Sequence, residues 1–177
     1  MGTKVFYGLV WTLATAALML LLFFTGFQTE RLATGKYLNY VGLLIPVAAL
    51  YLGIKAVRDE RPGGTMTYGQ GVSAGMAIST FAALMSAVYS WFHFTFVNPR
   101  FTDYTLEMVR QQWADRGMTV EQVEQAERIT RKMLTAPMQA VVGIFFTLLI
   151  GLVLSLIIAA ILKRDKPVSA ASATTPA

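Results

Sequence analysis

Residues 71–97 form an uninterrupted run without a single Asp, Glu, Lys or Arg. It is longer than the roughly 20 residues that a helix needs to cross the hydrocarbon core of a bilayer. Within lipid, a single segment can satisfy all its backbone hydrogen bonds only as a helix. We therefore predict a membrane-spanning helix here, and the rest of the chain has to fold around it.

Small residues recur at every fourth position of this stretch, at Gly71, Gly75, Ser79, Ala83 and Ala87. Positions four apart lie on one face of a helix, and small side chains allow two membrane helices to approach closely. The apolar run 138–162 has the same spacing, at Gly143, Thr147, Gly151, Ser155 and Ala159. We predict that the two faces pack together, Gly71, Gly75 and Ser79 against Gly143, Gly151 and Ser155.

Two further apolar runs, residues 5–27 and 38–54, bring the predicted spans to four. The first is longer than the 7–15-residue apolar core of a signal peptide, so we expect a retained helix. The second barely spans and has Pro46 near its middle, which predicts a kink that its neighbours accommodate or that serves as a moving part. Residues 1–162 are thus predicted to form an all-α integral membrane four-helix bundle.

Composition supports this interpretation, since 55% of the residues are hydrophobic and 14% are charged. The net charge of +5 lies at the ends of the apolar runs and not on a single basic face, which favours anionic lipid head groups as partners over nucleic acid. The chain has no Cys, which excludes thiolate chemistry and disulfides. Residues 163–177 begin with a basic cluster and continue in Pro, Ser, Ala and Thr, predicting a basic anchor and a disordered tail.

Residues 102–136, between the third and fourth runs, are polar and carry charges of both signs. We predict two short helices that form an αα-hairpin outside the bilayer, the first capped by Asp103 and ending at Gly117. The second opens with Thr119 and Gln122 in a capping box and pairs Glu127 with Arg131 four residues later.

The first predicted helix of this hairpin carries an apolar stripe of Leu106, Val109 and Trp113. This stripe can pack against one of two surfaces, the second hairpin helix or the membrane interface. Because an aromatic ring is favourable at head-group level, we expect the hairpin to fold back against the bilayer.

Several short motifs occur in a recognisable order along the chain. Gly63-Gly64 and Tyr68-Gly69-Gln70 precede the third run, Asn98-Pro99 follows it, and Gly-Met-Thr-Val-Glu-Gln-Val-Glu occupies 117–124. This order resembles the bacterial family of proteins of unknown function numbered 4199, over nearly the whole chain. The resemblance implies a bacterial integral membrane protein without an established activity.

An ionisable group at membrane depth is the usual mark of a proton or ion pathway. None of the four runs contains an acid, a lysine or an arginine, and His93 is their single titratable imidazole, among aromatics at the end of its run. We expect a structural hydrogen bond for it and take His93, Asn98 and Pro46 as the functional candidates. No catalytic, cofactor-binding or metal-binding residues are predicted.

Two functions from different classes follow from this sequence. The first is a noncatalytic membrane protein of the bacterial cytoplasmic (inner) membrane that packs with itself or with a membrane partner and presents the hairpin outside the bilayer. The alternative is a small transporter or channel subunit for a neutral or apolar solute. Dense basic clusters at the ends of the spans favour cytoplasmic termini.

Overall fold

The computed structural model describes residues 2–38 and 40–164, so the predicted tail from 165 onward lies outside the described residues. Four segments are long and apolar enough to cross a membrane, in agreement with the four predicted spans. They are α1 (Thr3–Phe24), the segment Val41–Asp59 that contains α3 (Leu44–Asp59), the segment Tyr68–Val97 that contains α4 (Tyr68–Phe92), and α7 (Ala136–Leu162). Short helices join them: α2 (Leu32–Leu38), η1 (Val41–Leu43), η2 (Pro62–Gly64), η3 (His93–Val97), α5 (Phe101–Asp115) and α6 (Val120–Met133).

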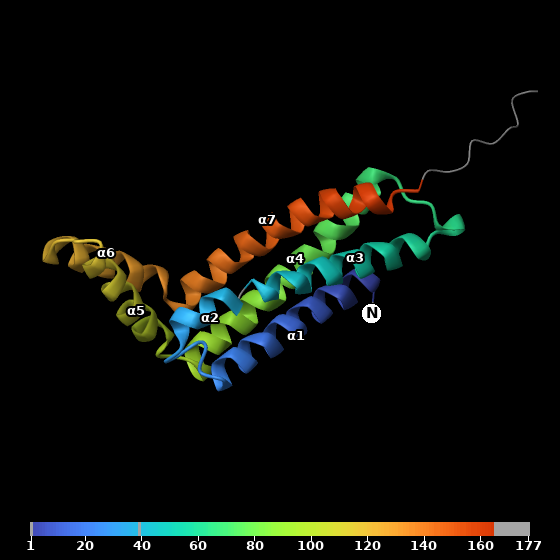
Figure 1. Cartoon of the computed structure of the whole chain (residues 1–177). Coiled ribbons are helices and arrows are strands. Elements are labelled where there is room, and N and C mark those ends of the chain that lie inside the picture. The colour runs from blue at the N-terminus through green and yellow to red at the C-terminus, as the bar shows by residue number, and fades with distance from the viewer. Residues whose placement is uncertain (1, 39, 165–177) are drawn as a thin grey trace, which may run out of the picture.

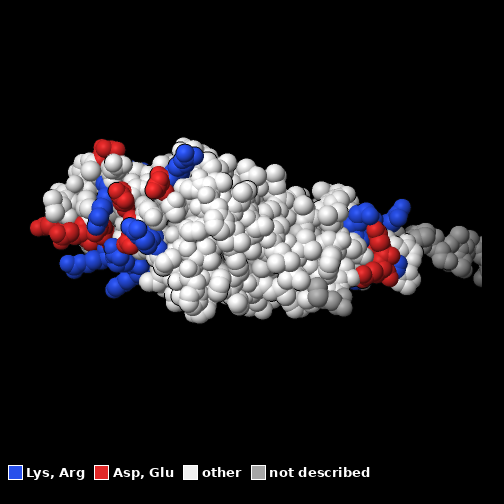
Figure 2. Space-filling model, turned by 90° about the horizontal axis from the view of Figure 1, so that it is seen from below, with Lys and Arg blue, Asp and Glu red and all other residues white. Residues whose placement is uncertain are grey.

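The four long helices lie side by side, with α4 in contact with α1, α3 and α7 (Figure 1). The beginning of α1 and the end of α7 lie at one end of the bundle, and α2, α5 and α6 lie at the other. Charged side chains gather at these two ends in Figure 2, and the body between them shows none on this face. This distribution is the one expected of helices that cross an apolar layer.

Two glycines allow α1 and α3 to approach α4 closely. A Cβ added to Gly8 in α1 would lie 3.1 Å from the carbonyl oxygen of Ile78 in α4. A Cβ added to Gly53 in α3 would lie 2.6 Å from the Cδ1 atom of the same Ile78. Ile78 is fully buried, and it belongs to the apolar core shared by α1, α3, α4 and α7.

The start of α4 is fixed by a capping box and by the end of α7. Gln70 N–H donates to Thr67 Oγ1, and Thr67 N–H donates to Gln70 Oε1 at 3.1 Å. Immediately before this cap, Met66 and Arg164 exchange two backbone hydrogen bonds of 2.9 Å. The loop between the second and third spans is thereby tied to the end of the fourth.

The second span differs from the prediction in its bounds and in the place of its proline. Leu32–Leu38 form a separate helix, α2, and the span runs from Val41 to Asp59, past Lys55. Pro46 lies in the first turn of α3, where a backbone N–H has no partner within the helix and its loss costs little. The predicted kink at mid-span is therefore wrong.

Helices α5 and α6 are joined by a tight turn at Gly117, whose φ of 72° suits glycine. The capping box of Thr119 and Gln122 forms as predicted. The first helix differs from the prediction, because its N-cap is Arg100 and Asp103 lies within its first turn.

The contacts between α5 and α6 run antiparallel. Thr102 Oγ1 donates to Leu134 O at 3.1 Å, and Arg131 pairs with Asp103 at 3.3 Å. Arg110 pairs with Glu127 further along. Glu127 and Arg131, which were expected to pair within one helix, thus bind α5 instead.

Candidate functional site

His93, one of the predicted candidates, is completely buried where α4 passes into η3. Its Nδ1 atom lies 3.2 Å from Tyr89 Oη, and its Nε2 atom lies 3.0 Å from Gln28 Oε1. Tyr89 Oη also lies 3.2 Å from the carbonyl oxygen of Ala16, to which it donates. The imidazole therefore connects α4 to α1 and to the loop that follows α1.

Asn98 adds a second connection to the same loop. Its side-chain Nδ2 donates to the carbonyl oxygen of Gln28 at 3.2 Å, and the Asn98 side chain is buried. Its backbone N–H donates to His93 O at 2.8 Å, five residues back, and closes the single π-turn of η3. Gln28 thus has two hydrogen-bond partners: the Gln28 side chain contacts His93, and the Gln28 main-chain carbonyl accepts from Asn98.

The hydrogen-bond roles in this cluster are linked. Tyr89 has one hydroxyl proton, so if it is donated to Ala16 then His93 Nδ1–H donates to Tyr89 Oη. His93 Nε2 then either donates to Gln28 Oε1 as an imidazolium or accepts from the Gln28 amide group as a neutral ring. The hydrogen-bond partners of His93 among the described residues, Tyr89 and Gln28, are neutral. These contacts orient the imidazole ring and hold α4 to the loop after α1, and they do not pair the ring with an acid.

Sequence reasoning identified two of the four residues in this cluster. His93 and Asn98 were candidates, whereas Gln28 and Tyr89 were not. The spacing of Tyr89 and His93, four apart on one helix face, was the available signal. Pro46, the third candidate, lies in α3 and takes no part in the cluster.

The small residues of α4 and α7 meet at three levels. An added Cβ on Gly71 would lie 2.8 Å from Ala159 Cβ, and one on Gly75 would lie 2.7 Å from Ser155 Cβ. An added Cβ on Gly151 would lie 2.5 Å from Ser79 Cβ. All three separations are too short for real side chains, so the backbone at each of these glycines packs directly against the facing side chain.

Gly143, the remaining residue of the predicted interface, is different. A Cβ added to it would meet no atom within 4 Å. The contact between α4 and α7 therefore does not extend along the whole stripe, and the two helices are separated at the level of Gly143.

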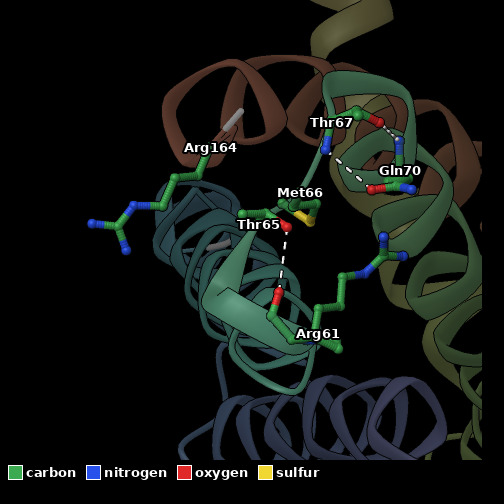
Figure 3. Close-up of a pocket in the computed structure, with 7 residues that line it drawn as sticks. Arg61, Thr65, Met66, Thr67, Gln70 and Arg164 are labelled. Atoms are coloured by element: carbon green, nitrogen blue, oxygen red, sulfur yellow. Dashed lines mark hydrogen bonds between the residues drawn. The ribbon is translucent and has the colours of Figure 1, made fainter. Parts of the chain in front are cut away.

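A hollow lies at the opposite end of the bundle from the His93 cluster, beside the start of α4. It has a volume of about 540 Å³ and is lined by Arg61, Pro62, Thr65, Met66, Thr67, Gln70 and Arg164. In Figure 3 the side chain of Arg61 extends in the direction of Gln70, whereas that of Arg164 points away. Neither arginine has an acidic partner among the described residues. A guanidinium group without an acidic partner can bind an anion such as a phosphate.

Within residues 2–38 and 40–164, no group of three or more His, Asp or Glu side chains is arranged to hold a metal ion. The model of the family described as "Protein of unknown function (DUF4199)" matches residues 6–164. Comparison with curated proteins and with solved structures found no match. The family match begins in α1, ends just after α7 and includes the hollow beside α4 and the His93 cluster. The chain therefore belongs to the DUF4199 family of proteins of unknown function.

Proposed function

We propose that this protein is a noncatalytic integral membrane protein of the bacterial cytoplasmic membrane that packs with itself or with a membrane partner. In this proposal α5 and α6 form a hairpin outside the bilayer, available to that partner. The observation that carries it is the separation of charge, with an uncharged body between two charged ends (Figure 2). The outer faces of the spans are apolar, as at Phe145 and Ile161, which are 70% and 67% exposed and suited to lipid.

The hairpin is proposed to rest on the head groups through the half of α6 nearest to α7. That half exposes Ile129 and Met133, at 54% and 55%, together with the basic side chains of Arg128, Arg131 and Lys132. Apolar side chains beside cations are typical of a helix lying at a membrane surface. The other half of α6 carries Glu121 and Glu124, and we propose that this acidic end faces the partner.

Nitroxide labels can test this placement, because the chain has no natural Cys. A label on Met133→Cys should be accessible to oxygen and shielded from a water-soluble nickel reagent, whereas a label on Glu121→Cys should show the reverse. Equal accessibility of both labels to the nickel reagent would show that the hairpin stands away from the bilayer.

Partner binding can be tested by replacing Glu124 in the full-length chain with a photo-crosslinking amino acid. Replacement of Phe145 with the same amino acid serves as the control. Position 124 should form one discrete crosslink with a protein, and position 145 should react with lipid. A crosslink to a second copy of the chain would identify self-association, and an absence of protein crosslinks at 124 would contradict a role for the acidic end.

The termini are proposed to be cytoplasmic. The end of the bundle at which α1 begins and α7 ends is assigned seven Lys or Arg residues and three acids, when Lys4, residues 55–67 and the sequence after 162 are counted together. The opposite end has eight basic residues and seven acids, most of them in 100–136. The hollow lies on the first side, where an anionic head group would bind the guanidinium group of Arg61. Alkaline phosphatase fused at the C-terminus should therefore be inactive, and strong activity would reverse this orientation.

The alternative, a small transporter or channel subunit for a neutral or apolar solute, is supported by one observation. A cavity of about 90 Å³ lies between α1, α4 and α7 and is lined by several hydroxyl groups. Solute flux in proteoliposomes that is lost on Gly143→Leu would favour this function over the first.

A further inference from the structure

The hollow beside the start of α4 lies where the apolar spans end. Its wall includes Met66 and Arg164, whose main chains exchange two hydrogen bonds of 2.9 Å. Arg164 comes two positions after Leu162, the last residue of α7. Charged side chains gather at this end of the otherwise uncharged body in Figure 2. In a bilayer the hollow would therefore lie at the level of the lipid head groups.

The capping box of α4 determines which polar groups of the wall can bind a ligand. Gln70 Oε1 accepts from Thr67 N–H at 3.1 Å, and Thr67 Oγ1 accepts from Gln70 N–H at 3.4 Å. The first bond fixes the orientation of the Gln70 amide, whose NH₂ group remains a donor, and the Thr67 hydroxyl keeps its own proton. Both side chains therefore have donors left to offer a ligand (Figure 3).

Arg61 adds a cation to these donors. Its half-buried side chain extends in the direction of Gln70 in Figure 3 and forms no hydrogen bond or ion pair with another described residue. The two acids that precede it bind elsewhere, since Asp59 pairs with two basic residues of α3 and Glu60 accepts from Thr3 Oγ1. A planar guanidinium group can donate two parallel hydrogen bonds to phosphate oxygens.

We infer that this hollow binds the phosphate group of an anionic phospholipid, with Arg61 as the cation and Thr67 and Gln70 as neutral donors. Its volume of about 540 Å³ lies within the roughly 300–1,000 Å³ of ligand pockets, so a head group fits. A soluble phosphate compound would offer the same oxygens, but a hollow at head-group level favours the lipid. The inference rests on the membrane placement proposed above and gives it a ligand of stated chemistry.

The test is native mass spectrometry of the full-length chain, purified in a non-ionic detergent and titrated with dioleoyl phosphatidylglycerol. Dioleoylglycerol has the same acyl chains without phosphate, and glycerol phosphate has the phosphate without the chains. Phosphatidylglycerol should bind at least about tenfold more tightly than either compound, because only this lipid has both parts. Equal binding of dioleoylglycerol, which would show that phosphate is not recognised, or of glycerol phosphate, which would indicate a soluble ligand, would overturn the inference.

Two arginine variants separate this site from general attraction between a basic protein and an anionic lipid. Arg61→Gln and Arg164→Gln remove the same charge from the wall of one hollow, but the Arg164 side chain points away from it in Figure 3. Arg61→Gln should weaken binding of phosphatidylglycerol about tenfold, the effect of losing one charged hydrogen-bond partner. Arg164→Gln should leave the affinity unchanged. Equal weakening by both variants would overturn the inference.

Gln70→Glu tests the site without removing a cation. Glutamate also serves at this position of a capping box, so the start of α4 should remain folded and the unfolding midpoint should not fall. The new carboxylate should pair with Arg61 and abolish the preference for phosphatidylglycerol over dioleoylglycerol. An undiminished preference in the folded variant would overturn the inference.

The titration in detergent does not depend on which side of the membrane the hollow faces or on a partner of the hairpin. The nickel-accessibility, crosslinking and phosphatase experiments test the proposed function separately. A chain that passes those tests but binds phosphatidylglycerol no better than dioleoylglycerol would refute this inference alone.

Discussion

Gly75→Ala tests the contact between α4 and α7 with the smallest possible change. The new Cβ would lie 2.7 Å from Ser155 Cβ and still closer to its Oγ, so the two helices have to separate or shift. Overpacking of this kind costs about 1–3 kcal/mol. Alanine regains roughly 0.5–1 kcal/mol of helix propensity over glycine, which leaves a net loss of about 0.5–2 kcal/mol. Gly143→Ala meets no neighbour and should be neutral or stabilising by up to about 1 kcal/mol.

The decisive variant moves the small residue to the other helix. Ser155→Gly in the Gly75→Ala background removes the two nearest atoms that the new methyl group meets. The third, Ile54 Cδ1 at 2.9 Å, is the end of a flexible side chain, so most of the lost stability should return. A coupling energy of about 0.5–3 kcal/mol is expected for residues in direct contact. The free energy of unfolding of the full-length chain would be measured in mixed micelles against the fraction of dodecyl sulfate. Equal effects of Gly75→Ala and Gly143→Ala, or no recovery in the double variant, would refute this packing.

Three further predictions concern single groups. Ser155→Ala should leave the free energy of unfolding unchanged or raise it, because the buried Oγ has no hydrogen-bond partner among the described residues; a loss above about 1 kcal/mol would contradict this. His93→Phe should lower that free energy by about 1–3 kcal/mol in the same titration, because it leaves Gln28 Oε1 buried without its partner, and an unchanged midpoint would argue against the cluster. Paired substitutions Gly71→Cys and Ala159→Cys should form a disulfide within one chain on mild oxidation, after the helices move apart by about 1 Å to reach the roughly 3.5–4.5 Å between the Cβ atoms of a disulfide; a chain that stays reduced would place these helices farther apart.

The four spans could be predicted from sequence because the signal is local: a charge-free apolar run of sufficient length has few alternatives in lipid. The prediction of the second span was the least accurate, because it relied on the same local signal. The chain carries no charge from Leu38 through Pro46, and Asn39 alone interrupts the apolar residues, so hydropathy gave little sign that the chain would break between α2 and η1. Pro46 was read as the middle of a span whose start was placed too early.

The small-residue stripes show where a local pattern stops being informative. Spacing places Gly143 on the same face of α7 as Gly151 and Ser155, and it is the one glycine of that face without a neighbour. Two helices that cross at an angle touch over a limited length and then separate. The sequence gives the period of the face but not the point of crossing, so the end of the contact and the cavity beside it could not be foreseen.

The His93 cluster depends on a contact that sequence spacing does not contain. Gln28 is 65 residues from His93 in the chain and becomes its partner only when the loop after α1 folds against the end of α4. Similarly, Glu127 and Arg131 are correctly spaced to pair within α6, yet each finds a partner on α5. Pairs between elements compete with pairs inside one helix, and the outcome depends on tertiary packing.

The central claim is that four spans cross the membrane and that α5 and α6 lie on the side opposite to the termini. Single substitutions Glu124→Cys and Thr65→Cys, in this chain without natural Cys, allow both sides to be labelled with a membrane-impermeant thiol reagent. In cells with a permeabilised outer membrane and an intact inner membrane, Glu124→Cys should be labelled and Thr65→Cys should not. Thr65→Cys should react once the inner membrane is opened. Labelling of both positions from the same side would contradict the account.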